Sequence, residues 1–214
     1  MPLYAETRKS IINYSGSLVF LYGILFGVYW LYTGFTTNNL GNWLLENTLT
    51  IPFIVLLYYL YRWHTFSNWS ITFIFIFLML HLFGSQHTYP ENPFGFWVKD
   101  LFQLQRNHFD RVVHFNFGFL LAYPMYEICR DKFNMPVWLN YLIPLQLIIS
   151  LGALYEIVEW LFADIFFPNK GPDFLGMQGD IWDAQKDMML AVLGAFLVLF
   201  GAYLFSSRNL STKK

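Results

Sequence analysis

The stretch MMLAVLGAFLVLFGAYLFS, residues 188–206, contains no charged side chain. A helix of this length measures about 28 Å, close to the hydrocarbon thickness of a bilayer, about 30 Å. The stretch therefore predicts a membrane-spanning α-helix.

Similar apolar runs recur along the rest of the chain. The six predicted spans are residues 11–32, 43–61, 69–83, 112–129, 137–162 and 188–206. Tryptophans fall near the ends of several runs, as they do at the headgroup level of membranes. The sequence predicts an all-α, polytopic transmembrane helical bundle of about six spans, with residues 1–214 forming one integral membrane domain.

Composition supports lipid as the solvent for most of the surface. Hydrophobic residues make up 56% of the chain and charged residues 13%, a balance that a soluble domain of this size would not keep off its surface. The net charge is −1 and no basic block occurs, so nucleic acid is excluded as a partner. The single cysteine, Cys129, excludes an intramolecular disulfide.

The basic residues predict the orientation. With a cytoplasmic N-terminus, eight of them are inside and five outside, which favours both termini in the cytoplasm. The inside set is Arg8, Lys9, Arg62, Arg130, Lys132, Arg208, Lys213 and Lys214, and the outside set is Lys99, Arg106, Arg111, Lys170 and Lys186.

Acids and histidines gather near the predicted outer ends of four spans, where two long loops, 84–111 and 163–187, are also expected. The candidate metal ligands are His81, His87, Asp110, His114, Glu156, Glu159, Asp180, Asp183 and Asp187. The spacings 110/114, 156/159 and 183/187 place each pair on one helix face, which the free-energy cost of lipid exposure should turn inward.

Each candidate also has a simpler interpretation. Asp110 and Asp180 could act only as helix N-caps, and His114 could be an interior hydrogen-bonding residue. Glu156 and Glu159 repel one another unless a proton, a cation or a basic side chain lies between them. The basic partners available are Arg106, Arg111 and Lys186.

A bound cation would fit the donor types. Either His81 or His87, in a loop expected at 81–89, could complete a mixed nitrogen and oxygen shell for Zn, Mn or Fe, whereas carboxylates alone suit Mg or Ca. Glu159 or His114 would then be the catalytic base. No named metal motif or serine-nucleophile motif occurs.

Four segments resemble a known family. GSQHTYPENP at 84–93, RNHFDRVVHF at 106–115, LYEIVEW at 154–160 and DFLGMQGDIWDAQKDM at 173–188 are similar to the YjdF-type family of bacterial inner-membrane proteins, whose activity is unknown. The resemblance implies a multi-pass protein of the bacterial inner membrane.

A fainter resemblance connects the same positions to the VanZ-like family of envelope-tolerance proteins. Asp110, His114 and Glu156 match that family's polar pattern, with Glu159 in place of the usual Gln and Asp187 in place of Asn.

Three functions remain open at this point. The first is a metal- or carboxylate-dependent enzyme at the outer membrane face, in contact with membrane lipid and acting on a lipid-linked or envelope substrate. The second is a non-catalytic membrane scaffold whose polar core fixes helix packing. The third is an ion or proton transporter, against which the chain shows no inverted repeat.

Overall fold

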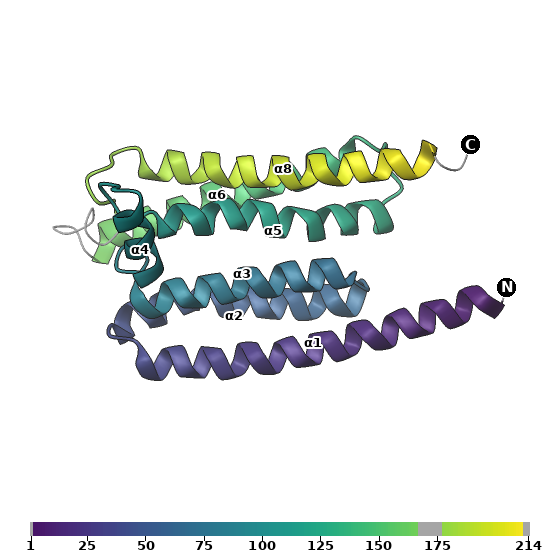
Figure 1. Ribbon diagram of the computed structural model, residues 1–214, viewed down its shortest axis with the longest axis horizontal. Helices are drawn as coiled ribbons and strands as arrows, with labels where there is room; N and C mark the ends of the chain where they lie inside the picture. Colours follow the sequence, from purple (N-terminus) through teal and green to yellow (C-terminus); the bar gives the residue numbers. More distant parts are fainter. Residues whose placement is uncertain (1, 167–176, 212–214) are drawn as a thin grey trace. The chain divides into compact units, whose positions relative to one another are not determined.

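The computed structural model of the chain describes residues 2–166 and 177–211, with side chains given for 16–166 and 177–206 (Figure 1). Every secondary-structure element in this part is a helix. In chain order they are α1 (Pro2–Thr36), α2 (Leu40–Trp63), α3 (Asn68–His87), α4 (Pro93–Leu101), α5 (Phe109–Lys132), α6 (Leu139–Phe166) and α8 (Asp183–Ser211). The predicted all-α fold class is confirmed.

The long helices match the predicted spans. Five of them, α1, α2, α3, α6 and α8, are long and apolar enough to cross a membrane. The sixth, α5, carries more polar residues and packs against both α6 and α8, which limits its contact with lipid. About six spans were predicted, and this arrangement is consistent with that number.

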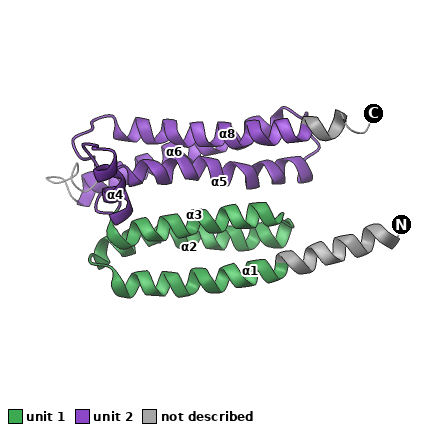
Figure 2. Ribbon diagram, in the orientation of Figure 1, with its two compact units in different colours: residues 1–88 green, residues 89–214 purple. Residues whose placement is uncertain are grey.

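The chain divides into two compact units, residues 1–88 and 89–214, and each is described by itself (Figure 2). Unit 1 holds α1, α2 and α3. Its helices are joined by polar side chains: Trp30 Nε1 donates to Asn47 Oδ1 at 2.6 Å, and Trp43 Nε1 donates to Thr33 Oγ1 at 3.1 Å. The prediction of a single domain stays a prediction.

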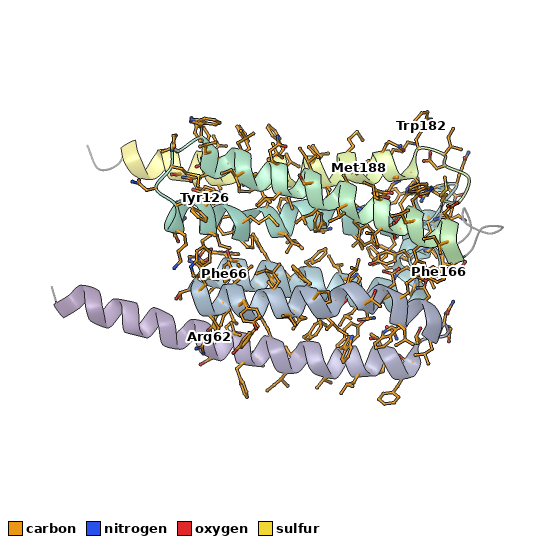
Figure 3. The ribbon with its side chains drawn as sticks, turned by 180° about the vertical axis from the view of Figure 1, so that it is seen from behind. Arg62, Phe66, Tyr126, Phe166, Trp182 and Met188 are labelled. Atoms are coloured by element: carbon orange, nitrogen blue, oxygen red, sulfur yellow. The ribbon has the colours of Figure 1, made fainter. Side chains whose placement is uncertain are left out.

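Unit 2 holds α4, α5, α6 and α8. Within it α5 and α8 run parallel and α6 packs against both (Figure 1). Large apolar side chains remain exposed on the outward faces of these helices, among them Phe166 at the end of α6 (Figure 3). Lipid is the solvent that such faces require.

Short polar side chains start three of the helices. Asn39, Ser67 and Asn92 each accept a hydrogen bond from a backbone N–H of the following turn, at the starts of α2, α3 and α4. In α4 the cap is followed directly by Pro93, whose fixed φ suits the first helical position.

The prediction of a loop at 81–89 was wrong for most of that stretch. Helix α3 continues through Gly84, Ser85 and Gln86 to His87, where Thr88 ends it with a φ of 61°. Polar residues here suggested a loop, yet Ser85 donates to the Leu82 carbonyl and Gln86 donates to Thr36, so both are satisfied inside unit 1. Part of the second predicted loop, residues 167–176, lies outside the described residues.

Candidate metal centre

The backbones of α5 and α8 approach one another unusually closely. A Cβ atom added to Gly118 would lie 1.8 Å from the carbonyl oxygen of Ala191, and one added to Gly194 would lie 2.1 Å from that of Phe115. Only glycine fits at both positions, as in other membrane helix pairs packed through small residues. His114 and Asp187 lie one turn before this crossing, so it holds them side by side.

Four side chains from three helices form what we call the acid cluster: Asp110 and His114 of α5, Glu156 of α6 and Asp187 of α8. One donor atom each from Asp110, His114 and Asp187 lies within 4.8 Å of the others. His114 Nε2 is 3.5 Å from Asp110 Oδ1 and 3.6 Å from Glu156 Oε1. His114 and Asp187 are buried, at 8% and 2% exposed, whereas the side chains of Asp110 and Glu156 are 24% and 12% exposed.

Two buried oxygens of the acid cluster have no hydrogen-bond partner among the described residues, namely Glu156 Oε1 and Asp187 Oδ1. Leaving a buried carboxylate oxygen unsatisfied is costly, by about 1–3 kcal/mol or more for a charged group. A partner beyond the described side chains, such as a cation, a water molecule or a proton, would remove this cost.

The spacing of the donors resembles that of ligands around one ion. Good hydrogen bonds measure about 2.7–3.2 Å, which is shorter than the separations of 3.5 and 3.6 Å from His114 Nε2. Ligands held about 2.1 Å from a single ion stand about 3.0–3.4 Å apart in octahedral or tetrahedral geometry. A small contraction of the cluster would bring its donors to such a distance.

A second group, the ion-pair network, consists of Arg106, Arg111, Lys186, Asp180 and Asp183. Arg106 donates two hydrogen bonds to Asp183, at 2.6 and 3.0 Å, and one to the carbonyl of Met177. Arg111 bridges Asp180 and Asp183, and Lys186 donates to Asp180 at 2.6 Å. The three basic residues thus bind these two aspartates, and none of their described ion pairs is with Glu156.

The ion-pair network fixes the charge of Asp180, which lies before the start of α8. The hydrogen bond from Lys186, assisted by that from Arg111, holds the pKa of Asp180 below its usual range. Its other oxygen accepts the backbone N–H of Trp182 at 3.2 Å. Helix α8 begins at Asp183, three residues after Asp180, so Asp180 is not the N-cap of that helix, although it accepts this one backbone N–H.

An amide clamp, formed by Asn92, Asn107 and Gln178, ties three segments of unit 2 together. The Asn107 side chain donates to the Asn92 carbonyl at 2.9 Å and accepts from the Phe109 N–H at 3.0 Å. Gln178 accepts from the backbone N–H of Asn107 and donates to its carbonyl. The sequence pattern does not predict this clamp; the dipeptide Asn92-Pro93 is its one local signal, because it is typical of a helix start.

The remaining predicted site residues belong to other segments of the chain. His81 and His87 belong to unit 1, where His81 Nε2 is 2.9 Å from Thr50 Oγ1 and the ring of His87 packs against Phe83. Glu159 is half-buried, one turn beyond Glu156 on α6. The N-cap of α5 is His108, so Asp110 is a first-turn residue and not the cap. The assignment of metal ligands stays a prediction.

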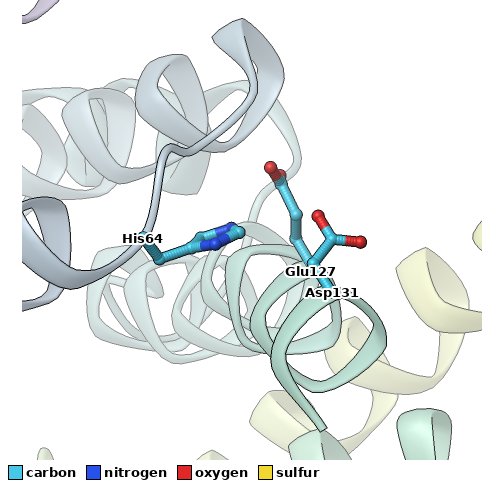
Figure 4. A group of neighbouring side chains, drawn as sticks. All are labelled: His64, Glu127 and Asp131. Atoms are coloured by element: carbon cyan, nitrogen blue, oxygen red, sulfur yellow. The ribbon is translucent and has the colours of Figure 1, made fainter. Parts of the chain in front are cut away.

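A further pair of acids occupies the opposite end of α5. Glu127 is buried and Asp131, one turn later, is exposed (Figure 4). Asp131 receives two hydrogen bonds from Arg130, at 2.6 and 2.9 Å. His64, drawn in the same figure, belongs to unit 1 and caps the end of α2. The Arg130 pair is exposed, and such pairs contribute little stability.

The apolar helices and the buried polar groups between them define a polytopic α-helical membrane protein. The family model described as "Predicted membrane protein (DUF2238)" matches residues 18–208, and the chain belongs to this family. "Inner membrane protein YjdF" of Escherichia coli (strain K12) is 32% identical over 181 residues, which cover 84% of this chain and 86% of that protein. No solved structure matches. The family expected from the four sequence segments is confirmed, whereas the VanZ-like resemblance stays a prediction.

Proposed function

We propose that the acid cluster binds a divalent cation and that the protein uses it at the outer face of the bacterial inner membrane, on a lipid-linked or envelope substrate. The observation that carries this proposal is the convergence of Asp110, His114 and Asp187 within 4.8 Å, with Glu156 beside them. Asp187 is 2% exposed, and its Oδ1 has no hydrogen-bond partner among the described residues. A bound cation would satisfy this oxygen.

Charge balance supports the same proposal. The acid cluster and the ion-pair network together hold five carboxylates (Asp110, Asp180, Asp183, Glu156 and Asp187) against three cationic side chains (Arg106, Arg111 and Lys186). If all five are ionised, five minus three leaves two negative charges, which one divalent cation neutralises. Without it, protons must compensate the repulsion.

The donor set indicates which ions suit the site. One imidazole nitrogen with carboxylate oxygens favours Zn, Mn or Fe, and Mg is the choice if the histidine stays outside the shell. A bound cation would polarise a phosphoryl or carbonyl oxygen of the substrate. Because His114 Nε2 faces Asp110 and Glu156, it suits a ligand better than a base, and Glu159 is the base that we expect to deprotonate the attacking water.

Two observations support the proposed localisation. The relative is named as an inner membrane protein, and the basic residues of this chain divide eight to five in favour of cytoplasmic termini.

The test is elemental analysis of the purified full chain in detergent, comparing wild type with Asp187→Asn. The matched control is Asp164→Asn, the same substitution at an exposed acid of α6. We expect about one metal ion per chain in wild type and control, and a loss in Asp187→Asn. Chelator should lower the melting temperature of wild type and control only, since an ion at a hundredfold excess over its dissociation constant stabilises by about 2.7 kcal/mol.

The scaffold is the second candidate, and the ion-pair network favours it. Its buried Arg106–Asp183 pair joins the segment before α5 to the start of α8 and fixes helix packing without any chemistry. Wild-type protein without metal, and with a melting temperature indifferent to chelator and to added Zn, Mn or Mg, would refute the cation site and favour this candidate.

A further inference from the structure

Helix α4 presents an apolar stripe that the described part of unit 2 leaves about half exposed. Phe94, Trp97 and Leu101 are spaced i, i+3 and i+7, which places them on one face, and they are 44%, 59% and 57% exposed. Phe102, directly after the helix, is 66% exposed. Large aromatic and aliphatic side chains gathered in this way mark a surface that contacts something apolar.

The stripe cannot turn inward, because the opposite face of α4 is locked. Asn92 caps the helix and is fully buried, and a Cβ atom on Gly95 would lie 1.7 Å from Asn107 Oδ1. The amide clamp holds Asn107 to the start of α5 and to Gln178. Rotation of α4 would break the clamp, so the exposure of the stripe is built into unit 2.

We infer that α4 is an interfacial helix whose apolar stripe lies in the boundary between lipid headgroups and acyl chains on the side of the acid cluster. The chain enters spans on both sides of it, since α3 ends at His87 and α5 starts at Phe109. These short connections keep α4 at the membrane surface. Its stripe therefore continues the lipid-facing surface of the spans.

Other exposed side chains on the side of the acid cluster also suit contact with lipid. Ile181 and Trp182, in the turn held by the ion-pair network, are 75% and 59% exposed (Figure 3). Lys99 lies over the ring of Phe96, with its ammonium 5.7 Å from the ring centroid, an arrangement that lets the charge reach the headgroups. Tryptophan, phenylalanine and lysine together are typical of helices that lie in the interface.

The inference is independent of the proposed cation and is tested in membranes. Single cysteines replace Trp97, Leu101 or Asp100 in a Cys129→Ser background, and each carries a nitroxide label. Asp100 is the exposed polar control on the same helix. The purified full chain is placed in vesicles of phosphatidylethanolamine and phosphatidylglycerol, and collision of each label with oxygen and with a water-soluble nickel chelate is measured by electron paramagnetic resonance.

We expect an oxygen-to-nickel collision ratio several-fold higher at 97 and 101 than at 100. Equal ratios with strong nickel collision at all three positions would place α4 in water and overturn the inference. Labels at 97 and 101 that are immobile and shielded from both reagents would also overturn it, because a second copy of the chain would then cover the stripe.

Discussion

Replacing Gly194 by alanine tests the close approach of α5 and α8 that assembles the acid cluster. The new Cβ would lie 2.1 Å from the Phe115 carbonyl oxygen and 2.8 Å from the Phe119 nitrogen, whereas real Cβ atoms keep at least 3.0 Å from such neighbours. The two helices must therefore separate by about 1 Å, and overpacking of this kind lowers stability by about 1–3 kcal/mol.

The matched control is Gly201→Ala on the same helix, where an added Cβ meets nothing within 4 Å. Both substitutions replace glycine by a better helix former, so any gain in helix propensity is shared. The difference in unfolding free energy between the two variants then reports the close approach. We expect Gly194→Ala to unfold at lower dodecyl sulfate concentration than wild type, and Gly201→Ala to be unchanged or slightly more stable.

Metal content provides a second measurement on the same variants. Because the crossing lies one turn from His114 and Asp187, its opening should also weaken cation binding in Gly194→Ala and spare it in Gly201→Ala. Equal unfolding curves for the two variants would refute the close packing of these helices, whatever the metal content.

Two further predictions concern the ion-pair network. Arg106→Lys keeps the charge but cannot reproduce the bidentate contact with Asp183. We expect the unfolding free energy to fall by about 1.5–3 kcal/mol in the same unfolding assay. An unfolding free energy equal to that of wild type would contradict the role of the pair. The lowered pKa of Asp180 means that its carboxylate stabilises the fold at pH values above the ordinary aspartate pKa, about 3.9, and that this contribution fades as the pH falls further toward the folded-state pKa. The unfolding free energy of wild type should therefore decline in acid more steeply than that of Asp180→Asn, and parallel curves would contradict the ion pairs with Lys186 and Arg111.

Most of the fold could be predicted because the bilayer imposes a length and a polarity on each span. The apolar run at 188–206 and five similar runs predicted the long helices, and α5 covers the predicted span 112–129. The ends were less predictable where polar residues continue a helix, as at Gly84 to His87 in α3. Helix α4 was missed because nine residues with two glycine or proline positions resemble a loop in hydropathy alone.

The candidate site was predictable only in part. The i,i+4 spacing predicted that Asp110 and His114 share one helix face, and the two side chains do lie side by side. The cost of lipid exposure predicted that Asp187 points inward, and this residue is buried. Pairing across long stretches of chain could not be read from spacing: Arg106 and Asp183 are separated by 77 positions, and Asn107 and Gln178 by 71. The sequence named Arg106, Arg111 and Lys186 as available bases but could not choose which carboxylates they bind.

The ion-pair network has a consequence for biogenesis. Asp183 and Asp187 begin the last described helix, and their neighbours on the segment from Arg106 to His114 are synthesised about seventy residues earlier. The insertion cost of a carboxylate is about 2.5–3.5 kcal/mol at the centre of a span and smaller for Asp183 and Asp187, which lie at the start of α8. Arginines already in place offset part of that cost. A chain that ends before Asp180 leaves Arg106 and Arg111 without their carboxylates, and we expect such a chain to be a substrate for the proteases that clear misassembled membrane proteins.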